Sequence, residues 1–244
     1  MQHRCILILS MCTVIMASCG AGTKSIRNVD SFADISSYKP EIFTTFQSAD
    51  STLKVYTTSF KVQNPLVTSG TSVRTIDPNH ENDIYCMATL LDSLSTEADI
   101  ASHCFSDSLD AAACESYREN YRAEQERPGM FRIRITMESG FSSKSMEPKL
   151  WSMYIENSRG IMIEPADIVA SPVTAQRDSV FSDFHRIFLP RRLLKREITL
   201  YFNRKTFFGE DLLSSKNPYI VFVMTFEKRT LVRVGWKTSA LPKK

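Results

Sequence analysis

Alternating apolar and polar residues mark most of the C-terminal half of the chain as β-strands. The segment 131–138 alternates apolar residues with charged or hydroxyl residues, which is the period of a strand with one wet face. The segments 151–155 and 198–202 alternate in the same way, and Leu231–Trp236 forms a last strand. Tyr219–Phe226 is almost wholly apolar, as expected of a central strand buried on both faces. Several short strands at near-regular spacing favour an antiparallel sandwich over a parallel sheet.

Proline residues and turn residues divide these strands. Asn157 to Gly160 supply turn chemistry before the apolar residues 161–163. Pro165 and Pro172 bracket another short strand, which we expect at a sheet edge because proline cannot donate to the strand ladder.

The N-terminal half predicts one strand followed by two helices. Residues 53–62 are rich in β-formers and predict a first strand. Asp77 and Pro78 are a cap and a first helical residue, and an apolar stripe then recurs at three- and four-residue steps, at Ile84, Met87, Leu91 and Leu94. A second helix should run from Ser106 to Arg127, where Pro128-Gly129 stops it. We therefore expect an α-helical hairpin, at about residues 78–127, inserted after the first strand.

The first eighteen residues have the pattern of a secretory signal. Arg4 precedes an apolar run that is too short to span a bilayer, and small residues follow it. The end of this leader, Met16-Ala17-Ser18-Cys19, resembles the lipobox of bacterial lipoproteins. The resemblance implies cleavage before Cys19 and lipidation of this residue. The alternatives are an ordinary cleaved signal, in which Cys19 is incidental, and a short buried helix.

On this prediction, residues 19–50 are the lipidated N-terminus and a Ser/Thr-rich tether, and residues 51–244 are the folded domain. The stretch from Trp151 to Trp236 also resembles the immunoglobulin-like sandwich domains of bacterial envelope lipoproteins, through the segments 151–157, 163–165 and 234–236. These are framework features without an active site. They imply a mainly β, antiparallel, immunoglobulin-like β-sandwich that carries the inserted α-helical hairpin.

Composition and charge exclude two classes of protein. The 244 residues are 43% hydrophobic and carry 30 Lys and Arg against 27 Asp and Glu, so the chain is neither disordered nor a strongly basic nucleic-acid binder. The densest basic run favours a solvated connection between two strands. The alternative is a contact with anionic lipid headgroups through its four cations, namely Arg191, Arg192, Lys195 and Arg196.

Three cysteines remain in the domain once the leader is removed and Cys19 is lipidated. An exported protein can oxidise them. Cys86 and Cys114 would lie at similar heights on the predicted helical hairpin, which favours a bridge between them. A bridge between Cys104 and Cys114 is the next choice, and three reduced, buried thiols are the remaining alternative.

No combination of residues predicts catalysis, a metal site or a cofactor. His80 and His103 lack the spacing to the cysteines that structural zinc sites use. Ser182 to His185 contain the residue types of a hydrolytic triad, but neighbours on a strand point to opposite faces. A Cys104 nucleophile beside His103 fails for a similar reason.

These observations predict an exported protein that a lipid anchors in the bacterial cell envelope, at the outer membrane if the host has two membranes. The expected role is a non-catalytic interaction or structural module that binds another envelope protein. The alternatives are a hydrolase that uses His185 or the Cys104 thiol, and a protein that captures a small ligand. A pocket with convergent polar groups would favour the alternatives, and an exposed apolar patch would favour the interaction module.

Overall fold

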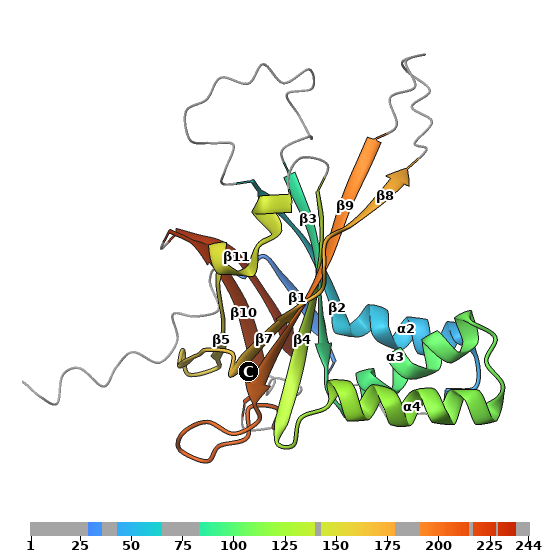
Figure 1. Cartoon of the computed structure of the whole chain (residues 1–244). Coiled ribbons are helices and arrows are strands. Elements are labelled where there is room, and N and C mark those ends of the chain that lie inside the picture. The colour runs from blue at the N-terminus through green and yellow to red at the C-terminus, as the bar shows by residue number, and fades with distance from the viewer. Residues whose placement is uncertain are drawn as a thin grey trace, which may run out of the picture.

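The computed structural model of the chain describes residues 29–35, 43–64, 83–139, 143–178, 191–214, 217–227 and 229–237. Two β-sheets pack face to face, and three helices lie together beside one of them (Figure 1). The predicted fold class, a mainly β sandwich with an inserted helical hairpin, is confirmed.

Sheet A has the strand order β1-β11-β10-β5-β6. Its strands are β1 (Ser31–Asp34), β5 (Ser152–Asn157), β6 (Met162–Ile163), β10 (Tyr219–Phe226) and β11 (Arg229–Lys237). All neighbours are antiparallel except β1, which runs parallel to β11. The central position of β10 and the burial of nearly all its residues confirm the prediction for this segment.

Sheet B has the order β2-β3-β4-β9-β7, and β8 also pairs with β9. Its strands are β2 (Thr57–Gln63), β3 (Asp83–Leu91), β4 (Met130–Ser139), β7 (Asp167–Ala170), β8 (Thr174–Asp178) and β9 (Arg191–Asn203). The strand between Pro165 and Pro172 is β7, and it lies at the end of the order, as predicted.

The core lies between the two sheets. From β4, the apolar residues of the alternating pattern point inward, and Trp236, Phe222 and Phe202 are fully buried against them. The indole N–H of Trp236 donates to the carbonyl oxygen of Tyr56 at 2.8 Å. This bond ties the last strand to the end of helix α2 (Phe46–Tyr56).

The prediction of a first strand over residues 53–62 is wrong at its start. Leu53 to Tyr56 form the last part of α2, and the strand β2 begins at Thr57. Thr45 caps this helix by accepting from the backbone N–H of Ser48. The helix was not predicted for two reasons. Its last residues are β-formers, and its cap Thr45 lies in the segment that we assigned to a tether.

The prediction of a helix that begins at residue 78 and carries the stripe from Ile84 is also wrong. The structure has β3 from Asp83, with Ile84 and Cys86 buried and Tyr85 and Met87 exposed. The run is apolar at nearly every position, so it fits both a helical stripe and the two-residue period of a strand. The segment forms a strand because it pairs with β2 on one side and with β4 on the other.

The helical hairpin exists, but it inserts between β3 and β4. It consists of α3 (Ser93–Ser106) and α4 (Ala111–Gln125), each capped by an aspartate, Asp92 and Asp110. The second helix therefore lies inside the predicted range, and the first begins later than predicted. Within the described residues, no helix is long and apolar enough to cross a bilayer.

The folded domain begins before residue 51. Strand β1 lies in the segment that we assigned to the tether, and its Phe32 ring lies over Gly235 of β11, where a Cβ atom would stand 2.5 Å from Phe32 Cε1. Only a glycine permits this close approach. The N-terminal segment therefore packs as part of sheet A from Ser31 onward.

Candidate binding cleft

The helical hairpin docks on the outer face of sheet B through polar side chains. No residue of α4 is fully buried. Arg134 of β4 donates two hydrogen bonds to the carboxylate of Asp99 on α3, at 2.7 and 2.8 Å, and the Tyr121 hydroxyl on α4 donates to the same carboxylate at 2.7 Å. One aspartate thus joins α3, α4 and the sheet, and we call these three residues the docking cluster.

Burial shapes the chemistry of the docking cluster. Burial and the charge of Asp99 raise the pKa of the Tyr121 hydroxyl, so this group stays protonated and donates. Burial works to lower the pKa of Arg134, but its hydrogen bonds and charge attraction to Asp99 outweigh it and raise the pKa. Both groups therefore hold one protonation state near neutral pH.

Two cavities lie where the hairpin meets the sheet. The first, the hairpin cavity of about 390 Å³, is lined by both helices, by Arg134 and by residues of β7 and β9. On its wall, the His103 ring stacks on Tyr117 with centroids 4.1 Å apart, and His103 Nε2 lies 3.4 Å from the carboxylate of Asp107. These contacts give His103 a packing role.

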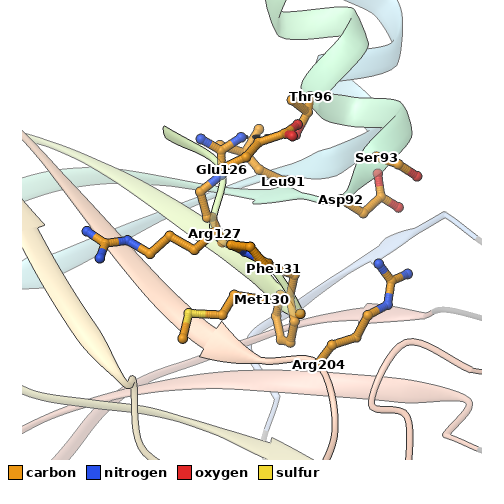
Figure 2. A pocket seen from close by; sticks show the side chains of 12 residues that line it. Leu91, Asp92, Ser93, Thr96, Glu126, Arg127, Met130, Phe131 and Arg204 are labelled. Atoms are coloured by element: carbon orange, nitrogen blue, oxygen red, sulfur yellow. Dashed lines mark hydrogen bonds between the residues drawn. The ribbon is translucent and has the colours of Figure 1, made fainter. Parts of the chain in front are cut away.

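The second, the cap cavity of about 370 Å³, lies at the start of α3. Its walls are the end of β3, the first turn of α3, the segment 126–132 and Arg204 (Figure 2). The residues Leu91 and Arg132 line both cavities. Together, the two cavities form what we call the hairpin cleft.

Most charges around the cap cavity have partners inside the domain. Asp92 accepts from the backbone N–H groups of Leu94 and Ser95, both at 2.9 Å, so its charge is held by the first turn of the helix. The guanidinium of Arg127 lies 2.8 Å from Asp167. Within the described ranges, Arg132 is the cation of this wall that has no carboxylate within 4.0 Å.

A second surface feature is the loop between β9 and β10, at the lower end of the view in Figure 1. Phe207 is 98% exposed and Phe208 is 77% exposed, and their rings meet edge to face with centroids 5.6 Å apart. We call residues 204–211 the aromatic loop.

The aromatic loop is a formed turn. The backbone N–H of Thr206 donates to the carbonyl of Glu210 at 2.8 Å, and that of Gly209 donates to the carbonyl of Thr206 at 2.9 Å. Gly209 has a φ of +77°, which a glycine adopts without steric cost. The turn therefore displays the two phenylalanine rings on a fixed backbone.

The structure pairs Cys104 with Cys114, the second of the sequence choices, and the favoured pairing of Cys86 with Cys114 is wrong. The favoured pairing assumed that Cys86 lies on a helix, whereas it is buried in β3. The bridge joins the end of α3 to the first turn of α4. In this bridge the Cys104 sulfur is not a free thiol.

The basic run is part of β9 and is not a connection between strands. Arg196 donates to Glu147 at 2.8 Å and to the carbonyl of Ser171 at 2.9 Å, and Lys195 lies 4.0 Å from Glu138. These two cations are engaged within the domain. The side chains of Arg191 and Arg192 lie outside the described part of the chain, and a headgroup contact there stays a prediction.

The other sequence candidates are placed only in part. His80, His185 and the lipidation residue Cys19 lie outside the described residues. Across the described ranges, no group of three or more His, Cys, Asp or Glu residues could hold a metal ion. Arg132, Phe207 and Phe208 were not among the predicted site residues. The two adjacent phenylalanines in a polar segment could have indicated an exposed apolar site.

The fold and the cleft define a β-sandwich with a docked helical hairpin and an aromatic loop. No protein-family model matches the chain, and no curated protein matches its sequence.

Proposed function

We propose that the protein is a non-catalytic binding module, anchored in the bacterial cell envelope by a lipid on Cys19, which holds a protein partner through the aromatic loop. The observation that carries this proposal is the pair of exposed rings, Phe207 and Phe208, on a formed turn. An exposed apolar feature was the expectation for an interaction module.

Burial of these rings would be the main gain on binding. A phenylalanine gains about 1.5–3 kcal/mol when it is fully buried, and an isolated exposed residue forgoes that energy. Aromatic side chains dominate the energetic centres of protein interfaces. Because the turn already fixes the backbone, binding would order little more than the two side chains.

The charges around the loop favour a protein over an anionic bilayer. The loop carries Arg204 and Lys205 against Glu210 and Asp211, so its net charge is zero. Arg159 lies 2.7 Å from Glu210 and adds a neighbouring ion pair. Arg204 lies 3.7 Å from Asp211, so two of the three cations around the rings are paired. A largely paired polar rim around an apolar centre is the usual anatomy of a protein interface, whereas attraction to anionic lipids needs several unpaired cations.

The lipid anchor rests on the resemblance of residues 16–19 to a lipobox, and the start of β1 at Ser31 limits its length. The chain from Cys19 to Ser31 spans at most about 40 Å when fully extended. A lipid on Cys19 would therefore hold the domain close to the membrane surface. The partner would be a protein of the same envelope surface.

Site-specific photo-crosslinking in the producing cells tests the proposal. A photoreactive residue in place of Phe207 should trap one protein, and the Phe208→Ser substitution in the same chain should abolish the product. Phe46, which is 44% exposed at the start of α2, is the matched control position and should give no such product. Products with lipid alone, or the same products from position 46, would overturn the proposal.

A further inference from the structure

Arg132 is a buried cation without a matching anion. Its side chain is 4% exposed, and it lines both cavities of the hairpin cleft. Its Nη2 donates to Thr96 Oγ1 at 3.1 Å, and the guanidinium lies 5.4 Å from the centre of the Tyr121 ring. Among the residues that the structure describes, no carboxylate lies within 4.0 Å of it.

The contrast with the other partly buried arginines is informative. Arg134, two residues further on the same face of β4, is matched by Asp99, and Arg233 of β11 is matched by Glu156 at 2.5 Å. Proteins pair the charges that they bury, because an unmatched buried charge loses its hydration without compensation. Thr96 offers a neutral oxygen to one of the five N–H donors of Arg132.

The space beside Arg132 suits a small ligand. The cap cavity of about 370 Å³ lies in the size range of small-molecule sites. The hydroxyl groups of Ser93 and Thr96 line this cavity, together with the carboxylates of Asp92 and Glu126 (Figure 2). A guanidinium is the group that best matches the planar fork of a carboxylate.

We infer that Arg132 anchors a binding site in the cap cavity for a small molecule that carries a single carboxylate. The carboxylate balances the charge of Arg132, and the hydroxyl groups of Ser93 and Thr96 supply further hydrogen-bond donors. The acidic residues Asp92 and Glu126 disfavour a doubly charged group such as phosphate, because they repel the second charge. This site meets the aromatic loop at Arg204 but is lined by neither Phe207 nor Phe208, and a ligand there would lie against the hairpin and the sheet together.

Titrations of the full-length protein in detergent test the inference. Sodium benzoate and sodium acetate are added at constant ionic strength, with sodium chloride as the reference. The melting temperature should rise with a saturable dependence on either carboxylate, and the side-chain N–H signal of Arg132 in the NMR spectrum should shift with the same dissociation constant. No saturable response up to 100 mM, or an equal or tighter response to inorganic phosphate, would overturn the inference.

Variants separate this site from a structural role of Arg132. Arg132→Lys keeps the charge but loses the fork and should weaken carboxylate binding at least tenfold. Arg132→Met should abolish carboxylate binding. Without ligand, the melting temperature of this variant should equal or exceed that of the parent protein, because the substitution removes an unmatched buried charge. Arg118→Gln changes a paired arginine of α4 that lines neither cavity and should stay within twofold of the parent protein. Equal binding by the parent and Arg132→Met would contradict the inference.

Discussion

At the scale of single residues, the fold depends on a few side chains whose surroundings differ from what their sequence neighbours suggest. Cys86 is one of them: it is a free cysteine that lies buried in β3. Burial raises the pKa of its thiol to about 12, which makes it unreactive near neutral pH.

The Cys86 thiol should make stability fall at alkaline pH. In the unfolded chain this thiol loses its proton near pH 9, whereas in the folded protein it holds the proton up to about pH 12. Between these values the folded state binds more protons, so the free energy of unfolding decreases by up to about 1.4 kcal/mol per pH unit.

Urea denaturation at several pH values measures this effect. The Cys86→Ala variant is the control, because it lacks the thiol but keeps the other alkaline groups, such as Tyr121. The stability difference between the parent and Cys86→Ala should narrow from pH 9 to pH 12 and stay constant below pH 8. A difference that is the same at pH 7 and pH 11 would contradict the prediction.

The residue scale also shows what the sequence could not predict. The alternation in β4 placed Arg132 and Arg134 on a wet face, and the structure covers both with the helical hairpin. Periodicity gives the side of the strand on which a residue lies, but it does not say what packs on that side. The binding site that we infer therefore has no local sequence signal.

At the scale of elements, the two helices of the hairpin differ in packing: α3 buries six residues, whereas α4 buries none. The docking cluster and the bridge between Cys104 and Cys114 hold α4 in place. The ion pairs that Arg118 and Arg122 form with Glu97 lie near the solvent and contribute little.

The Asp99→Ala substitution should loosen the hairpin and leave the sandwich intact. It removes the shared partner of Arg134 and Tyr121, and at this partly exposed site we expect a loss of about 1–3 kcal/mol, below the 3–5 kcal/mol of a fully buried pair. Amide hydrogen exchange should accelerate at least about fivefold in α4 and remain unchanged in β10.

Glu115→Gln is the matched control, since Glu115 pairs with Arg118 at an exposed position of α4. This variant should exchange like the parent protein. Acceleration spread equally over α4 and β10 in Asp99→Ala would show that the cluster supports the whole domain, contrary to the prediction.

Element types were predictable where one period dominated. In the segments 131–138 and 198–202, apolar and polar residues alternate, which predicts a strand with one wet face. In Tyr219–Phe226, the apolar run is continuous but only as long as a strand, which predicts a strand buried on both faces. The segment of β3 was assigned to a helix because its apolar residues satisfy both periods. The cysteine pairing failed with it, since the height argument needed Cys86 on a helix.

At the scale of the whole molecule, the lipid anchor is the feature that would fix the place of the domain in the cell. The Cys19→Ala substitution should move the protein from the membrane pellet to the soluble fraction, because the segment 19–30 would carry no acyl chains. Fractionation followed by immunoblotting measures this change. Cys86→Ala is the control and should stay in the pellet, and a Cys19→Ala protein that remains there would show that the anchor is wrong.

The whole-molecule scale also explains why the sandwich was predictable and its start was not. Strand spacing over the C-terminal half indicates two antiparallel sheets. The four residues of β1 are too few to produce a pattern, and they join sheet A only through pairing with β11, which lies about two hundred positions later.

The parallel pairing of β1 with β11 has a mechanical consequence. The backbone N–H of Asp30 donates to the carbonyl of Arg233, and β1 then runs toward Lys237, at the end of sheet A where β10 begins. A tether that pulls on Asp30 and a partner that pulls on the aromatic loop would act at opposite ends of this sheet. The load would run along the strands and shear β1 against β11, so the evenly spaced bonds of the parallel ladder would share the force instead of opening one after another.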